Sequence, residues 1–292
     1  SGLAFLNILY STYFDYFLSI DSYTATFFLA LVTGSLFCYY GKNSVKKINF
    51  YEQLLLVILV YLISSIFIAM PYYLSNYQIT FFDSVFESFS GITSTGFSIF
   101  ENIKYLDPTL ILWRSSSQWI GGLYFIIFLI IIFSNNQYNF RLNQLVFTGN
   151  MGSFSKSNTK NILLQIFLVY SLLTLLILII LSMGNVRLFN SLNLSMTIIS
   201  NGGFLPTNSL DQIFLKDNYY ILAVTLLIPT INIFFLFNLF NRKRIISDHQ
   251  EDLFLIIFIS ILSMIMFYSL KNVNFSEVLI NIISSISNSG IS

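Results

Sequence analysis

Long apolar stretches alternate with short polar segments along most of this chain. Six stretches approach the roughly 20 residues that a helix needs to cross the hydrocarbon core of a bilayer. They lie at about 23–40, 51–73, 110–133, 161–183, 219–240 and 253–270. The pattern predicts an all-α polytopic membrane protein, preceded by an aromatic segment whose structure the pattern does not define.

Composition agrees with this pattern and excludes several functions. Hydrophobic residues make up 55% of the chain and charged residues 9%, against about 25% charged in soluble domains. The net charge of +1 offers no basic surface for nucleic acid. No His/Cys cluster, nucleophile–base pair or phosphate-binding loop occurs, so we expect neither an enzyme nor an organic cofactor.

The distribution of basic residues predicts the orientation in the membrane. Nine of the fourteen Lys and Arg residues lie in three alternate loops. They are Lys42, Lys46, Lys47, Arg141, Lys156, Lys160, Arg242, Lys243 and Arg244. Because short cytoplasmic loops are enriched in Lys and Arg, we place these loops in the cytoplasm and the intervening ones outside.

One polar, glycine-containing segment occurs three times. FDSVFESFSGITSTGFS (82–98) aligns with FNSLNLSMTIISNGGFL (189–205) and SEVLINIISSISNSGIS (276–292). Each copy follows an apolar stretch and predicts a half-helix of about 11 residues, or roughly 16 Å, about half the thickness of the hydrocarbon core. Because the third copy ends the chain, we expect a fragment of a longer protein.

The repeat predicts a ring of backbone around an ion path. Irregular backbone at membrane depth is tolerated only where it is buried in protein or lines a water-filled cavity. Carbonyl oxygens in such a ring can replace the hydration shell of a cation, and the negative C-terminal ends of the half-helices favour one. The alternative is a set of re-entrant or interfacial loops in which the glycines only form turns.

The candidate filter residues follow from the alignment. They are Thr93, Ser94, Thr95, Gly96, Phe97, Ser200, Asn201, Gly202, Gly203, Phe204, Ser287, Asn288, Ser289, Gly290 and Ile291. The backbone carbonyls expected to bind the cation are those of Thr93, Thr95, Ser200, Gly202, Ser287 and Ser289. Serine should be tolerated better at Gly202 than at Gly203, because hydroxyl residues occupy the Gly202 column in the other copies.

Arg114 lies near the outer start of an apolar stretch and has two interpretations. An arginine near a helix end can extend to the interface, and we favour such an anchor. The alternative is a brace for the first half-helix, paired with Glu87 or Asp83.

Further polar and small residues support the candidate filter. We expect Gln118 and Trp119 to pack behind the first filter segment, and Gly121 and Gly122 to allow a close helix–helix contact. Asn232 lies in an apolar stretch, where an interhelical hydrogen bond is favoured over a pore-lining role.

Four sequence segments resemble one family. FESFSGITSTGFS, LILWRSSSQWIGG (110–122), SNGGF and PTINIFFLFNLF (229–240) are similar to the Trk/Ktr/HKT superfamily of potassium transporters, and most similar to the bacterial Trk membrane subunit. The resemblance covers nearly all of the chain from about Tyr23. The sequence departs from the family at Leu123 and Tyr124, where a further glycine is common, and at Ile291, where an aromatic residue is commoner.

The resemblance implies four helix–pore-helix–filter-loop–helix units around a pseudo-fourfold pore. Residues 1–45 would then be N-terminal membrane helices, 46–140 the first unit, 141–245 the second, and 246–292 a third unit truncated at its filter. In the family, an intramembrane gating loop and an intramembrane arginine belong to parts that this chain does not include.

The implied function is potassium uptake across the cytoplasmic membrane, driven by the membrane potential or coupled to H⁺ or Na⁺. Family members with serine at the first filter glycine transport sodium, so Gly96 favours potassium. The resemblance also implies a homodimer on cytosolic nucleotide-binding regulatory subunits, docked at 134–160 and 242–252. A sodium-selective transporter, a gated channel, and a membrane enzyme or scaffold remain alternatives.

The predicted topology can be tested with single cysteines in the full-length protein. Cysteines at Asn102 and Thr207 should react with an impermeant thiol reagent from outside. Those at Ser44 and Ser155 should react only from inside, because basic residues surround them. The reverse labelling pattern would contradict the proposed orientation of the pore.

Overall fold

We describe a computed structural model of the chain. It describes residues 1–16, 20–42, 49–133, 159–214, 218–230, 250–270 and 273–291. The helices in chain order are α1 (Gly2–Tyr13), α2 (Ile20–Gly41), α3 (Phe50–Tyr73), α4 (Phe81–Ile92), η1 (Ile103–Tyr105), α5 (Pro108–Phe133), α7 (Thr159–Met183), α8 (Leu188–Ile199), η2 (Leu210–Gln212), α9 (Tyr219–Thr230), α11 (Gln250–Ser269) and α12 (Phe275–Ser287).

The helices match the predicted apolar stretches. All six stretches coincide with α2, α3, α5, α7, α9 and α11, although residues 231–240 of the fifth lie outside the described part of the chain. The undefined aromatic segment contains helix α1. Within the described ranges, α2, α3 and Leu163–Met183 of α7 are long and apolar enough to cross a membrane.

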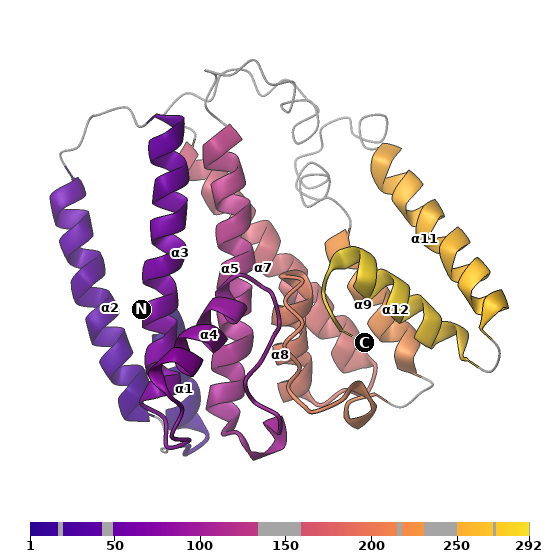
Figure 1. The fold of residues 1–292 in the computed structure, drawn as a ribbon, viewed down its shortest axis with the longest axis horizontal. Coiled ribbons are helices and arrows are strands. Elements are labelled where there is room, and N and C mark those ends of the chain that lie inside the picture. The colour runs from indigo at the N-terminus through magenta and orange to yellow at the C-terminus, as the bar shows by residue number, and fades with distance from the viewer. Residues whose placement is uncertain are drawn as a thin grey trace.

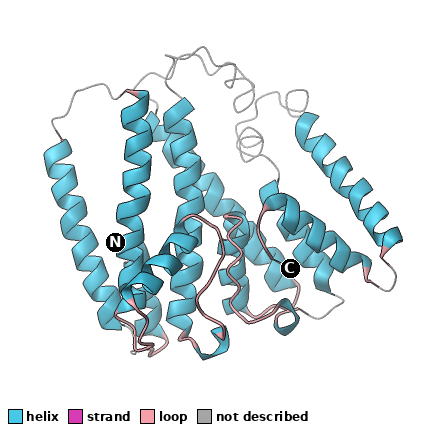
Figure 2. Ribbon diagram, viewed as in Figure 1, coloured by secondary structure: helices cyan, strands magenta, loops and turns pink. Residues whose placement is uncertain are grey.

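Short helices alternate with long ones. Figure 1 shows α4, α8 and α12 beginning at the lower end of the bundle and ending near its middle. Figure 2 shows helices joined by loops, with no strand among the described residues. Each short helix packs against the long helix before it, and α8 and α12 also pack against α5 and α9 of the preceding unit. Each of these two half-helices thus packs against a long helix of its own unit and one of the preceding unit.

Polar residues mark the start of each half-helix. Asp83, Asn190 and Glu277, which the alignment superimposes, are each the third residue of their helix. At α4, the Thr80 side chain accepts a hydrogen bond from the Asp83 amide at 3.2 Å. Such caps satisfy backbone donors that the first helical turn leaves free.

Two glycines let α5 pass close to two half-helices. A Cβ atom on Gly121 would collide with the Ile92 carbonyl oxygen at the end of α4. A Cβ on Gly122 would lie 2.9 Å from the Ser200 Cβ at the end of α8, and 2.7 Å from the Tyr170 hydroxyl. The close helix contact predicted for this pair is present, and it joins α5 to both neighbours.

We expect Gly121→Ala to destabilise the protein. The added methyl group would meet backbone, which cannot move like the end of a flexible side chain, and overpacking of this kind costs about 1–3 kcal/mol. Gly34→Ala is the matched control, because no heavy atom lies within 4 Å of a Cβ placed there. Thermal unfolding of the purified full-length protein should show a lower midpoint for Gly121→Ala only; equal midpoints would contradict the close approach.

Candidate functional site

The three half-helices end in the same hydrogen-bonded turn. In the first, the Thr95 amide donates to the Ser90 carbonyl at 2.9 Å, and the Ser94 amide donates to the Gly91 carbonyl at 3.0 Å. These two bonds form a Schellman motif, which turns the chain out of a helix through one left-handed residue. The bond between residues five positions apart recurs in the other two half-helices. The Gly202 amide donates to the Thr197 carbonyl at 2.8 Å, and the Ser289 amide donates to the Ser284 carbonyl at 3.1 Å.

Two left-handed residues recur in each of the following loops, which we call loop 1 (93–97), loop 2 (200–204) and loop 3 (287–291). The φ angles are 54° at Ser94, 53° at Asn201, 55° at Asn288, 85° at Gly96, 80° at Gly203 and 63° at Gly290. The sequence alignment had already identified the glycine position as part of the candidate filter. It also carried a signal for the earlier column, because asparagine is enriched in the left-handed region.

The loops meet through their glycines. A Cβ placed on Gly96 would lie 2.5 Å from the carbonyl oxygen of Gly202 and 3.5 Å from the Gly203 Cα. A Cβ placed on Gly203 would collide with the carbonyl oxygen of Ser289. The same backbone contact therefore links loop 1 to loop 2 and loop 2 to loop 3.

The side chains of the three loops differ more than their backbones. Phe97 is 70% exposed, whereas Phe204 and Ile291 in the same column are buried. The exposed Thr93 and Thr95 hydroxyls lie 2.7 Å apart.

Hydroxyl groups in the other two loops have partners nearby. The Ser200 hydroxyl reaches the Thr197 carbonyl at 3.0 Å, and the Ser287 hydroxyl reaches that of Ser289 at 3.1 Å. The backbone conformation, and not the side chains, is thus the feature that the loops share.

Arg114 is the largest fully buried side chain near the loops. Its Nε donates to Oε1 of Glu87 at 2.8 Å, and both side chains are at most 1% exposed. Its Nη2 donates to the Ser98 hydroxyl at 2.9 Å, and the second Glu87 oxygen accepts the Ile99 amide at 2.9 Å. The favoured interpretation of Arg114 as an interfacial anchor is therefore wrong, since the pair braces α4 against the chain leaving loop 1.

The same guanidinium also touches loop 2. Its central carbon lies 4.3 Å from the centre of the Phe204 ring and 5.4 Å from that of Phe100. A guanidinium over an aromatic face is attracted by the quadrupole of the ring. Arg114 thus contacts side chains of α4, of the segment after loop 1 and of loop 2.

Gln118 and Trp119 lie elsewhere than predicted. Gln118 hydrogen-bonds loop 2, with its Nε2 donating to the Gly202 carbonyl at 2.5 Å and its Oε1 accepting the Phe204 amide at 3.2 Å. Trp119 faces α7, where its Nε1 donates to the Thr174 hydroxyl at 3.0 Å. Helix α8 of the next unit packs against α5, so the hydrogen-bond partners of the two side chains lie in loop 2 and α7 and not in loop 1.

There is less space for a side chain at Gly202 than the hydroxyl residues at the aligned positions suggested. A Cβ at this position would collide with the Gln118 amide group. The expectation that serine is better tolerated here than at Gly203 stays a prediction, because a Cβ on Gly203 would meet backbone at a φ of 80°, whereas the Gln118 amide is the end of a side chain that can move. Asn232 and most of the two predicted docking loops lie outside the described residues.

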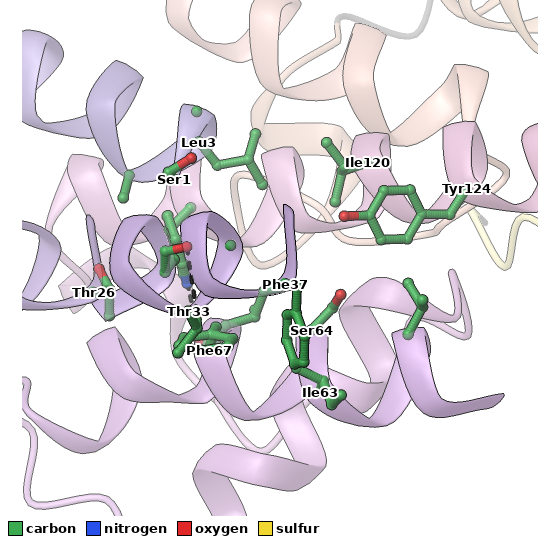
Figure 3. Close-up of a pocket in the computed structure, with 17 residues that line it drawn as sticks. Ser1, Leu3, Thr26, Thr33, Phe37, Ile63, Ser64, Phe67, Ile120 and Tyr124 are labelled. Carbon is green, nitrogen blue, oxygen red and sulfur yellow. Dashed lines mark hydrogen bonds between the residues drawn. The ribbon is translucent and has the colours of Figure 1, made fainter. Parts of the chain in front are cut away.

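A separate cavity of about 510 Å³ lies between α1, α2, α3 and α5. Phe37, Phe67, Ile120 and Tyr124 line it in Figure 3. Its lining includes none of the loop residues, so it does not enter the candidate site.

Comparison with known proteins supplies the wider context. No protein-family model matches the chain. Over 192 residues it is 28% identical to an uncharacterized cation transporter of Methanocaldococcus jannaschii, covering 63% of this chain and 39% of the relative. It is 30% identical over 112 residues to the Trk system potassium uptake protein TrkH of Escherichia coli, covering 38% of this chain and 23% of that protein.

Two further matches cover more of the chain. The potassium uptake protein TrkG of Escherichia coli is 24% identical over 263 residues, 84% of this chain and 52% of TrkG. The crystal structure of the potassium transporter TrkH from Vibrio parahaemolyticus superposes with a TM-score of 0.73 at 20% identity, over 97% of this chain and 61% of that one. The chain is similar in sequence to Trk potassium uptake proteins and shares the fold of the solved TrkH.

This similarity to Trk proteins confirms several predictions. The fold is all-α, as predicted, and it matches 61% of the solved TrkH chain. Its relatives are transporters and not enzymes. Together with the apolar helices, they identify a multi-pass protein of the cytoplasmic membrane. The chain spans about a quarter to about a half of the curated relatives described above.

We expect Arg114→Met to destabilise the protein by about 3–5 kcal/mol, because it leaves the Glu87 carboxylate buried without its counter-charge. The double variant Arg114→Met with Glu87→Leu should recover much of the loss. Thermal unfolding of the purified protein checks both, with Glu101→Gln at an exposed position as control. A double variant less stable than Arg114→Met alone would contradict this account of the pair.

Proposed function

We propose that the full-length protein takes up potassium ions across the cytoplasmic membrane through a filter formed by loops 1, 2 and 3 and a further loop of the same kind. The observation that carries the proposal is the repeated contact between a glycine of one loop and a carbonyl oxygen of the next. The names of TrkH and TrkG as potassium uptake proteins support the choice of ion.

The proposed filter works through backbone oxygens. Carbonyls of Thr93, Thr95, Ser200, Gly202, Ser287 and Ser289 would replace the water molecules around potassium. The C-terminal ends of α4, α8 and α12, which carry a partial negative charge, would lower the energy of a cation nearby. Glycine keeps side chains out of this path and adopts the left-handed backbone without strain.

Four units of the family type would complete the pore. We propose that 46–140, 141–245 and 246–292 contribute the first, the second and part of the third unit, and that 1–45 packs outside them. A Cβ on Gly290 would meet no heavy atom within 4 Å among the described residues, which leaves room for a fourth loop there.

The membrane potential, or coupling to H⁺ or Na⁺, would drive the uptake. Glycine in the column of Gly96 favours potassium over the sodium-selective alternative. Flux measured against the electrochemical gradient would distinguish a coupled transporter from a gated channel. A homodimer that binds cytosolic nucleotide-binding subunits through 134–160 and 242–252 would complete the assembly.

The test is a Gly203→Ser substitution in the full-length protein. The new side chain would meet the Ser289 carbonyl and impose strain at a φ of 80°. We expect normal membrane insertion, but loss of most potassium transport or of the preference for potassium over sodium. Rubidium and sodium uptake, in cells that lack their own potassium systems, measures both.

Gly34→Ser provides the matched control, because the same side chain meets nothing within 4 Å there. It should transport like the parent protein. If Gly203→Ser, at equal surface expression, also transports rubidium and sodium like the parent, loop 2 does not form part of the filter.

A further inference from the structure

One side chain on α5 holds the backbone of loop 2 on both sides of Gly203. Gln118 is fully buried. Its amide satisfies the Gly202 carbonyl as donor and the Phe204 amide as acceptor, at 2.5 Å and 3.2 Å. Buried backbone groups without partners cost free energy, so this double contact fixes the direction of the Gly202 carbonyl.

The contact breaks the symmetry of the three loops. Thr95 and Ser289 occupy the position of Gly202 in loops 1 and 3. Across the described ranges, no side chain donates a hydrogen bond to either of their carbonyls. Since the loops otherwise share their left-handed angles and turn bonds, the carbonyl of Gly202 is the one held by a donor from another element.

The held carbonyl also faces the neighbouring loop. It is the oxygen that a Cβ on Gly96 would approach to 2.5 Å, so its direction sets the separation of loops 1 and 2. Selectivity in a carbonyl filter depends on the spacing or on the field strength of its oxygens. A donor that occupies one lone pair changes both.

We infer that Gln118 is a positioning residue that sets the preference for potassium over sodium by orienting the Gly202 carbonyl. The inference rests on the proposed function, because it takes loop 2 as part of the filter. It assigns a specificity role to an α5 side chain that is itself outside the loops.

Gln118→Met tests this role in the full-length protein. Methionine is similar in length but forms neither hydrogen bond, so the Gly202 carbonyl is free to reorient. We expect the ratio of rubidium to sodium uptake to fall about tenfold at parental surface expression. Thr225→Val is the matched control, since Thr225 is buried in α9 and its hydroxyl donates to the Leu222 carbonyl of the same helix; its ratio should stay parental.

If Gln118→Met does not reach the membrane, a second variant and a second measurement still test the inference. Gln118→Asn keeps the amide but is one methylene shorter, so it cannot span both backbone groups, and its ratio should also fall. In the purified protein, potassium should raise the melting temperature more than equal sodium does. This difference should shrink in both Gln118 variants and persist in Thr225→Val.

The outcomes separate this inference from the proposed function. Parental uptake ratios and parental potassium stabilisation in the Gln118 variants, with Gly203→Ser impaired, overturn the role of Gln118 alone. An equal fall in Thr225→Val also overturns it, because any buried polar group would then have the same effect. Parental transport by Gly203→Ser overturns the filter itself.

Discussion

The arrangement of the three loops depends on direct backbone contact at Gly96 and Gly203. At each position the space that a Cβ would need is taken by the carbonyl oxygen of the next loop. The left-handed φ angles at the same residues add a second reason for glycine. Short half-helices, their common turn and the neighbouring long helices all serve to bring these few backbone atoms together.

Helix α5 supplies most of the support that reaches across units. Its charged and amide side chains, Arg114 and Gln118, contact the chain after loop 1 and the backbone of loop 2. Its glycine pair then passes the ends of α4 and α8. Four residues of one helix thus join two half-helices, which explains why polar and small residues interrupt an otherwise apolar stretch.

Much of this fold was predictable because membrane helices and the repeat leave strong local signals. Apolar length predicted the long helices, and the alignment predicted the half-helices and the glycine column. The pairing of Arg114 with Glu87 was one of the alternatives that the sequence offered, whereas the partners of Gln118 and Trp119 were not predictable in the same way. The partners of these two residues belong to the second unit, and their position against α5 depends on three-dimensional arrangement and not on spacing along the chain. The asparagine column in the left-handed region was a local signal that the sequence did contain.

The ion pair between Glu87 and Arg114 has a consequence for synthesis of the chain. An isolated arginine within a membrane helix costs about 2.5–3.5 kcal/mol on insertion scales. Glu87 precedes Arg114 by 27 residues, so the carboxylate emerges from the ribosome first. The pair of helices α4 and α5 can therefore neutralise its own charge without a contribution from α7 or α8. Gln118, in contrast, has its hydrogen-bond partners in loop 2. The first unit can therefore assemble in the membrane before the contact between Gln118 and loop 2 joins it to the second unit.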